Sequence, residues 1–212
     1  YRVGRLVTQS PEKVYYATEL SLVAIDKTDG AVEFVSKVDG LTDVGISLLT
    51  YNAGRKQLII AYENSVLDLI SENGTVTTLP QIRNFTNIVG AKEIYHFFLA
   101  DPNTLFIAAN YGISRVNLDP AEFAFTTFTG TEVTSVVTLQ NYLYAATEEG
   151  IYRIRLDNPN PENFGNWTLM GDEQGIPAGA TRALAVYNNT LYFDVNDQLY
   201  RLDGNQAILV HS

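Results

Sequence analysis

Residues 58–70, "LIIAYENSVLDLI", decide the fold. Two short apolar runs flank the polar letters "ENS", which is the pattern of a tight β-hairpin. The same pattern occurs four more times along the chain. The other copies are "VYYATELSLVAID" at 14–26, "LFIAANYGISRVN" at 105–117, "LYAATEEGIYRIR" at 143–155 and "LYFDVNDQLYRLD" at 191–203. The chain is therefore an internal repeat.

One position of the repeat gives its period. It is occupied by Ala17, Ala61, Ala108, Ala146 and Asp194, so successive copies lie 38 to 48 residues apart. Four-stranded propeller blades repeat every ~40 to 45 residues. The sequence therefore predicts an all-β fold, a β-propeller of five four-stranded antiparallel blade repeats. Because the position is small in four copies of five, we also expect it to be tightly packed.

Each copy contains one apolar strand before the hairpin and one strand after it. The predicted inner strands lie near residues 3–9, 45–51, 93–99, 132–139 and 181–187. The predicted blades cover approximately 3–36, 44–80, 93–128, 132–170 and 181–211, in a single domain over 1–212. The sequence leaves open whether five blades close the ring or form part of a larger one, since no strand is visibly exchanged between first and last blade.

A second phrase recurs between blades. "DGLTDVGIS" at 39–47 precedes the inner strand of the second copy, and "QGIPAGATR" at 174–182 precedes that of the fifth. Gly40 and Gly175 are turn residues in these phrases, and the apolar Leu41 and Ile176 follow them. We interpret both segments as joints between blades and expect the apolar residue to plug the space between blades.

Composition limits the partners. Lys+Arg number 14 against Asp+Glu 24, a formal net charge of −10, so phosphate backbones and anionic surfaces repel the chain on average. Nucleic acid is therefore excluded as a partner.

The chain has no Cys, hence no disulfide and no thiolate zinc site. No apolar run reaches the ~18 residues of a membrane span, and because residue 1 is Tyr, we expect a processed or excised portion of a longer, soluble product.

The run "SKVDGLTDVGISLLTYNAGRKQLIIAYENSVLDLISENGTVTTLPQIRN" at 36–84 resembles the N-terminal propeller of PorZ-like proteins, surface components of the type IX secretion system. More distantly, "GLTD" followed by a strand and a "YENS"-type turn is similar to the two-component regulator propeller repeat of sensor ectodomains. The resemblance covers all five copies and is weakest after Asn158.

What the PorZ resemblance implies is a non-enzymatic propeller at the periplasm or cell surface of a Gram-negative bacterium. The parent protein would carry a second propeller and a C-terminal β-sandwich. It would act in a surface complex that handles secreted cargo and binds lipopolysaccharide, so the implied partners are secretion-complex proteins, surface glycans and further domains of the parent chain. The alternative resemblance implies the ligand-sensing periplasmic propeller of a hybrid histidine kinase.

Residues for catalysis or metal binding are scarce, so no catalytic residue and no cofactor are predicted. His96 and His211 are the only histidines, and His96, between Tyr95 and Phe97, reads as a packed residue with one satisfied nitrogen. The stretch "DVNDQ" at 194–198 has oxygen side chains at alternate positions, but it lacks the Gly and distal Glu of a calcium loop. A turn is therefore favoured there, and cation binding is left open.

The binding candidates lie at strand starts and in one loop. Asp43, Glu93 and Glu132 open inner strands and face the expected funnel, as does Arg182. The same carboxylates are the alternative as a glycan-cleaving pair, which would need to lie within ~5 to 10 Å of one another. Trp167, the only Trp, ends the irregular segment 156–167, which we expect to project from the propeller edge and contact partners or a neighbouring domain.

Overall fold

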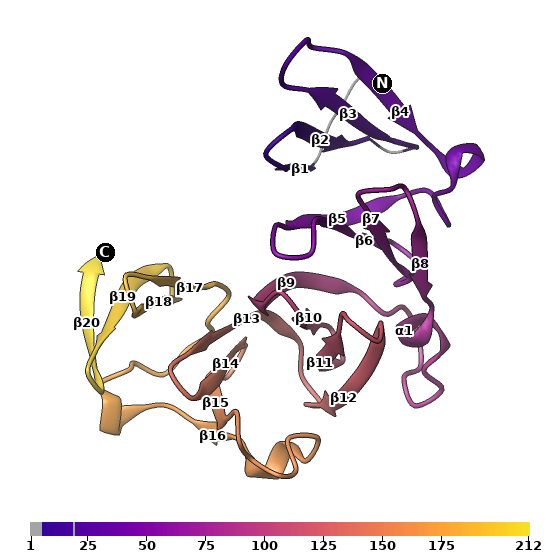
Figure 1. Cartoon of the computed structure of the whole chain (residues 1–212). Coiled ribbons are helices and arrows are strands. Elements are labelled where there is room, and N and C mark those ends of the chain that lie inside the picture. The colour runs from indigo at the N-terminus through magenta and orange to yellow at the C-terminus, as the bar shows by residue number, and fades with distance from the viewer. Residues whose placement is uncertain (1–5, 19) are drawn as a thin grey trace. The chain divides into compact units, whose positions relative to one another are not determined.

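The computed structural model describes residues 6–18 and 20–212, which form five four-stranded antiparallel sheets (Figure 1). Blades 1 and 2 consist of β1 (Leu6–Gln9), β2 (Lys13–Ala17), β3 (Leu22–Asp26) and β4 (Val32–Val35), then β5 (Ile46–Asn52), β6 (Gln57–Tyr62), β7 (Leu67–Ser71) and β8 (Val76–Leu79). Blade 3 consists of β9 (Ile94–Asp101), β10 (Thr104–Ala109), β11 (Gly112–Asn117) and β12 (Glu122–Phe128). Blades 4 and 5 consist of β13 (Val133–Leu139), β14 (Tyr142–Thr147), β15 (Gly150–Arg155) and β16 (Thr168–Leu169), then β17 (Leu184–Tyr187), β18 (Thr190–Val195), β19 (Gln198–Asp203) and β20 (Gln206–His211).

Strands follow chain order in every sheet, as in a propeller blade, so the predicted fold class is confirmed. The first strands of blades 2, 3 and 4 begin one residue after the predicted positions. Residues 3–5 of the first predicted strand lie outside the described residues. The longest helix in the described part of the chain, α1 (Gln81–Asn84), has four residues.

The first strand of blade 5 begins at Leu184, three residues later than predicted. The reason is the Asp194 carboxylate, whose Oδ1 accepts hydrogen bonds from the Arg182 and Ala183 amides at 2.9 and 2.7 Å. These amides would otherwise extend the ladder with β18. A side chain at the repeat's small position thus shortens the strand.

The chain divides into two compact units. Unit 1 comprises the chain up to Ile94 with Asp101–Asn103 and Leu118–Glu122, and it holds blades 1 and 2. Unit 2 comprises Tyr95–Ala100, Thr104–Asn117 and Phe123–Ser212, and it holds blades 4 and 5 with most strand residues of blade 3. That residues 1–212 form a single domain, and how the ring closes, stay predictions.

Apolar residues from adjacent blades pack together inside each unit. One cluster joins blades 1 and 2, and two clusters in unit 2 join blade 3 to blade 4 and blade 4 to blade 5. The four repeat alanines are all at least 99% buried, as expected of a tightly packed position: they are Ala17, Ala61, Ala108 and Ala146. Fully burying a Val, Leu or Ile side chain contributes about 1.5 to 3 kcal/mol, so the three apolar clusters stabilise the contacts between adjacent blades.

Residues with positive φ fall where the repeat predicted hairpin turns. Between the second and third strands they are Ser65 in blade 2, Gly112 in blade 3, Gly150 in blade 4 and Asp197 in blade 5. Gly and small polar residues adopt this left-handed conformation at the lowest steric cost. In an antiparallel meander these turns lie at the same end of the blade as the start of the first strand. That end therefore collects the joints, the starts of the first strands and four of the predicted site residues: Asp43, Glu93, Glu132 and Arg182.

Candidate functional site

The joint of blades 1 and 2 is built around a short 3-10 helix, η1 (Lys37–Asp39). The Ser36 amide donates to the Asp39 carboxylate at 3.0 Å, and Gly40 ends the helix with φ 118. The Leu41 amide then donates to the Ser36 carbonyl at 3.1 Å, which closes the turn. Leu41 is 4% exposed and packs in the cluster shared by blades 1 and 2, so its predicted role as a plug is confirmed.

The joint of blades 4 and 5 repeats this geometry. Helix η3 (Asp172–Gln174) ends at Gly175 with φ 65, and the Ile176 amide donates to the Gly171 carbonyl at 3.1 Å. Ile176 is 2% exposed and packs in the cluster shared by blades 4 and 5. The two phrases found in the sequence are therefore one structural device used twice.

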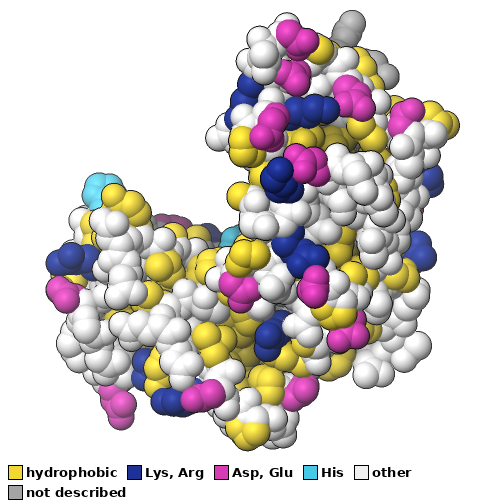
Figure 2. All heavy atoms as spheres, in the orientation of Figure 1, with side chains coloured by type: hydrophobic (Ala, Val, Ile, Leu, Met, Phe, Trp, Pro, Cys, Tyr) yellow, Lys and Arg dark blue, Asp and Glu magenta, His cyan; other side chains and the backbone are white. Residues whose placement is uncertain are grey.

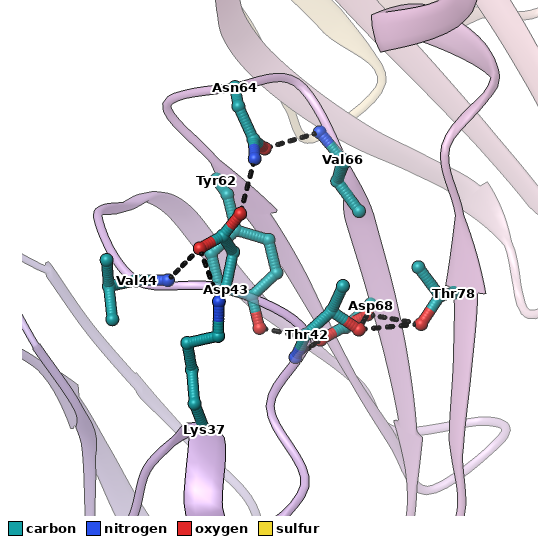
Figure 3. Close-up of polar contacts among 9 residues, drawn as sticks. All are labelled: Lys37, Thr42, Asp43, Val44, Tyr62, Asn64, Val66, Asp68 and Thr78. Atoms are coloured by element: carbon teal, nitrogen blue, oxygen red, sulfur yellow. Dashed lines mark hydrogen bonds and ion pairs between the residues drawn. The ribbon is translucent and has the colours of Figure 1, made fainter.

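A buried carboxylate fastens the first joint to blade 2 (Figure 3). Asp68, on β7, is fully buried, and its oxygens accept hydrogen bonds from the Thr42 amide at 2.9 Å and the Thr42 hydroxyl at 2.7 Å. The Tyr62 hydroxyl donates at 2.6 Å and the Thr78 hydroxyl at 2.9 Å. Burial, and then the bond to Asp68, raise the pKa of Tyr62, so its phenol keeps the proton that it donates. Four donors replace the hydration that this carboxylate loses.

Asp43, one of the predicted site residues, is occupied by its own joint. Its carboxylate accepts from Lys37 Nζ at 3.0 Å, the Val44 amide at 3.0 Å and Asn64 Nδ2 at 2.6 Å (Figure 3). The hydrogen bond from Lys37 and then that from Val44 lower the pKa of Asp43. The residue thus links η1, the joint and the hairpin turn of blade 2, which is an orienting role.

Two predicted site residues are brought together in unit 2. Glu132 and Arg182 line one hollow of about 410 Å³ with Glu148 and three smaller residues, Thr134, Ala180 and Thr181. We call this set the blade 4–5 hollow. Glu132, Glu148 and Arg182 are exposed, and Arg182 forms only a loose ion pair with Asp197 at 3.5 Å. Three charged groups thus face solvent at one place.

The backbone around the hollow is fixed by cross-blade hydrogen bonds. The Thr134 hydroxyl donates to the Arg182 carbonyl at 2.8 Å, and the Thr181 amide donates to the Thr147 carbonyl at 2.9 Å. The Thr181 side chain is 1% exposed, and its hydroxyl has no hydrogen-bond partner among the described residues. Unsatisfied buried hydroxyls are uncommon, so this one is a candidate contact for water or a ligand.

The remaining carboxylate, Glu93, lies in unit 1 and is exposed at the start of β9. A catalytic pair of Glu132 with either Asp43 or Glu93 would draw on both units, since Asp43 and Glu93 belong to unit 1 and Glu132 to unit 2. The structure brings Glu132 together with Arg182 and Glu148. The roles of these residues stay predictions.

His96 is packed as expected. It lies on β9 facing β13, and its Nδ1 accepts a hydrogen bond from the Val136 amide at 3.3 Å. Burial lowers the pKa of His96, so the ring is neutral at pH 7 and acts as a hydrogen-bond acceptor between blades 3 and 4. The "DVNDQ" stretch is a turn, with Asn196 and Asp197 at positive φ.

Trp167, a predicted binding residue, is buried and therefore not available for contact with a partner. Trp167 is 6% exposed and packs with residues of blades 3 and 4. Its indole Nε1 donates to the Pro161 carbonyl at 3.1 Å, and the same carbonyl accepts from the Thr127 hydroxyl of blade 3 at 2.8 Å. Trp167 and Pro161 thus anchor the segment to blades 3 and 4, because an indole N–H needs a partner when the ring is buried, while residues 156–166 remain exposed or half-exposed.

Sequence reasoning missed Asp68, Glu148 and Thr181. Glu148 was within reach, because the "TEEG" turn lies at the same end of blade 4 as the start of β13. Asp68 gave no signal: in the aligned copies its position is occupied by Ala24, Arg115, Arg153 and Arg201, so a charged residue there is ordinary for the repeat. Thr181 had none, since a Thr before a strand is an ordinary β-forming residue.

No group of three or more His, Cys, Asp or Glu suited to a metal ion occurs among residues 6–18 and 20–212. Within the same residues, none of the helices has the length and apolar character needed to cross a membrane.

Comparison with known proteins gives a family and several similar structures. The family described as "TSS9, PorZ, N-terminal beta-propeller domain" matches residues 14–168. A structure of PorZ, described as an essential bacterial surface component of the type-IX secretion system of Porphyromonas gingivalis, is 22% identical with a TM-score of 0.87. The match covers 97% of this chain and 28% of that one. No curated protein matches the chain.

Extracellular domains of sensors are also similar in fold. One, from a putative hybrid two-component system of B. thetaiotaomicron, is 15% identical with a TM-score of 0.67, over 97% of this chain and 28% of that one. Another, from a putative one-component system of the same organism, is 12% identical with a TM-score of 0.69, over 94% of this chain and 27% of that one. The chain thus spans less than a third of the length of these three structures.

Proposed function

Because the chain belongs to the family of PorZ N-terminal β-propeller domains, we propose that it is a non-catalytic binding and scaffold module of an exported bacterial surface protein that serves type IX secretion. The observation that carries the proposal is the family match over residues 14–168, which includes the first joint and most of four blades. In this proposal the module contacts secretion partners or a surface glycan such as lipopolysaccharide.

The blade 4–5 hollow is the contact site that we propose for such a partner. Its carboxylates, guanidinium and threonine hydroxyls are strong hydrogen-bonding groups held on strand ends whose backbones are fixed. Sugar rings present several hydroxyls that both donate and accept, so they can satisfy acids, Arg and Thr at once. A polar hollow of about 410 Å³ suits one or two sugar rings better than an apolar ligand.

Charge sets a condition on a lipopolysaccharide partner. The chain has a formal net charge of −10, and anionic sugars or phosphates would be repelled on average. Glu132 and Glu148 are oxygen donors of the kind that hold divalent cations, and a cation shared with the glycan would reverse the repulsion. We therefore expect binding of an anionic glycan through this hollow to need Ca²⁺ or Mg²⁺.

The test uses the full-length protein in its own bacterium. Replacing Glu132 with Lys and Arg182 with Glu together leaves the net charge unchanged but reverses two of the three charges of the hollow. We expect the variant to reach its normal location while type IX cargo attached to the cell surface falls several-fold. Glu162→Lys with Arg201→Glu, which alters charges outside the hollow, is the matched control and should behave as wild type.

Absence of catalysis is tested on the purified protein and on variants of the two hollow carboxylates. The purified protein is expected to hydrolyse no glycoside in a panel of surface glycans, with or without Ca²⁺. Hydrolysis that Glu132→Gln or Glu148→Gln abolishes would overturn the proposal and favour a glycan-cleaving enzyme.

The alternative function is a ligand-sensing propeller of a two-component sensor, which the similarity to two sensor ectodomains supports. It predicts that deleting the gene changes transcription of a small set of genes and leaves secretion intact. Cargo retained inside the cells of the deletion strain, with normal transcription, would favour the secretion role instead.

A further inference from the structure

A second hollow lies within unit 1, between blades 1 and 2. It has a volume of about 410 Å³ and is lined by residues of β2, β3, β4, β5, β6 and β7 and the turns that connect them. We call it the blade 1–2 groove. Figure 2 shows acidic and basic side chains gathered around an apolar floor where these two blades lie.

The floor of the groove is apolar and aromatic. Leu22, Leu58 and Ile70 line it, and Tyr15 and Tyr51 stack across the two blades with ring centroids 6.4 Å apart and planes 19° apart. Both tyrosines are partly exposed. Tyrosine rings present an electron-rich face that attracts cations and aliphatic chains alike.

The walls of the groove carry a net negative charge. Four acids and two lysines line it: Glu12, Asp26, Glu33 and Glu72, with Lys13 and Lys56. Lys13 pairs with Glu33 at 3.0 Å and Lys56 with Glu72 at 3.2 Å, so these four side chains balance in charge.

The other two acids of the groove, Glu12 and Asp26, form no ion pair with either lysine of the groove. The hydrogen bond from the Thr28 amide lowers the pKa of Asp26, which keeps this carboxylate ionised at any physiological pH. The groove therefore joins an apolar aromatic floor to an excess of two negative charges.

We propose that the blade 1–2 groove binds a Lys or Arg side chain of an extended partner polypeptide. The aliphatic stem would lie along Tyr15 and Tyr51, and the cationic head would meet Glu12 and Asp26. Lys and Arg side chains bury their stems against apolar surface while the head stays in a polar environment. Arg fits the site better than Lys because its planar head also stacks on aromatic rings.

Other occupants match the groove less well. An anionic glycan would meet two uncompensated carboxylates, and a purely apolar side chain would leave them without a partner at the cost of partial desolvation. The net charge of −10 also favours the approach of basic segments over neutral ones. This inference is independent of the blade 4–5 hollow and its glycan.

Nuclear magnetic resonance on the isotope-labelled full chain tests the inference with three blocked tripeptides: tri-arginine, tri-citrulline and tri-glutamate. Citrulline has the shape of arginine without its charge. We expect tri-arginine to shift the amide signals of Glu12, Tyr15, Tyr51 and Glu72 in a saturable manner, tri-citrulline to bind about 10-fold more weakly, and tri-glutamate not to bind.

Variants decide whether the groove itself is responsible. Glu12→Gln with Asp26→Asn should weaken tri-arginine binding about 10-fold, since each exposed charge pair is worth up to about 1 kcal/mol. Glu162→Gln with Asp203→Asn makes the same change in net charge elsewhere and should bind as wild type. Tyr51→Leu keeps an apolar floor and should still weaken binding.

Three results would overturn the inference: shifts spread over acidic residues of the whole surface, equal weakening in the two charge-matched double variants, or no saturable shift at millimolar tri-arginine. A circular dichroism spectrum equal to that of the wild type confirms that each variant is folded.

Discussion

The two joints share one backbone and differ in what fastens it. In both, a 3-10 turn ends at a left-handed glycine and a buried aliphatic residue plugs the space between blades. In the first joint, Thr42 and Asp43 follow the plug and bind side chains of the next blade. In the second, Pro177 and Ala178 stand at these positions. The glycine and the plug define the joint, and the means of fastening is interchangeable.

The second joint is held by backbone contacts and by the side-chain amides of Gln174, Asn196 and Gln206. The Asn196 amide donates to the Ala180 carbonyl at 3.4 Å, which corresponds to the 2.8 Å bond from the Glu63 amide to the Gly45 carbonyl in the first joint. Asn196 Nδ2 also donates to the Ala178 carbonyl at 3.1 Å. A buried carboxylate network is therefore not required for this geometry.

The comparison predicts its largest effect at Asp68. Asp68→Ala leaves the Tyr62, Thr42 and Thr78 donors without their charged acceptor, and we expect a loss of about 3 to 5 kcal/mol in the free energy of unfolding. Urea denaturation measures it. Asp68→Asn keeps one acceptor oxygen and should cost less than Asp68→Ala.

The second joint supplies the counterpart. In the strand register, Tyr200 of β19 corresponds to Asp68 of β7, and its hydroxyl donates to the neighbouring Gln198 at 2.8 Å. Tyr200→Phe should therefore cost less than about 1 kcal/mol. Equal losses for Asp68→Ala and Tyr200→Phe would contradict the view that the first joint depends on its carboxylate.

The next effect concerns β6, which pairs with the strand that follows the first joint. Ala61 is fully buried, and its carbonyl accepts from the Ser47 hydroxyl just after the first joint at 3.2 Å. Ala61→Leu should overpack this layer and lower the free energy of unfolding by about 1 to 3 kcal/mol. Ala31→Leu, at an exposed turn, is the control and should change the melting temperature little. An unchanged melting temperature for Ala61→Leu would show that the layer has room.

The two joints also differ in the space that surrounds a glycine, Gly179 in the second joint and Gly45 in the first. Gly179 has φ 151, and a Cβ there would overlap the Asn196 amide group, which is held by its bond to Ala178. In the first joint, a Cβ on Gly45 would meet only the exposed Glu63 carboxylate at 3.1 Å, which can move away. Both substitutions with Ala place a side chain at positive φ, at about 1 to 2 kcal/mol.

We therefore expect Gly179→Ala to destabilise the protein by about 1 kcal/mol more than Gly45→Ala, because it adds a steric overlap. Thermal melts of the two variants measure the difference. Adding Asn196→Gly to Gly179→Ala should recover the excess, and failure to recover it would place the strain elsewhere.

Features of the joints that depend on local sequence could be predicted, and features that depend on distant partners could not. The period of the repeat predicted the five sheets, the left-handed turns and both plugs, because Gly, small turn residues and alternating apolar residues have strong local preferences. The buried positions of Asp68 and Trp167 were not predicted. Each is determined by a partner distant in sequence, Thr42 for Asp68 and Thr127 through Pro161 for Trp167, and such partners leave no local pattern.

Site residues show the same limit. That Glu132 and Arg182 face the same hollow follows from the shared end of neighbouring blades, which the repeat alone indicates. That Asp43 is tied to Lys37 and Asn64 depends on side-chain reach across a joint. The positions of Asp43 and Glu132 at strand starts are alike in the sequence, so the sequence could not show that Asp43 is bound by Lys37 and Asn64 while Glu132 is exposed.

The smallest expected effect distinguishes Asp43 from Asp68. The pKa of Asp43 is lowered in the folded protein, so its stabilising contribution is complete above the unfolded value of about 3.9 and disappears as pH falls through the folded value. Its pair with Lys37 is partly exposed, and Asp43→Asn should therefore cost less than about 1 kcal/mol at pH 7. The cost should therefore be smaller at pH 3 than at pH 7, because Asp43 is already largely protonated in the unfolded chain at pH 3. Urea denaturation of wild type and variant at both pH values measures this, and 1 M NaCl at pH 7 should also reduce the difference. A cost of several kcal/mol, or one that is the same at pH 3 and in high salt, would mean that Asp43 anchors the joint as Asp68 does, and the two carboxylates would then form one network.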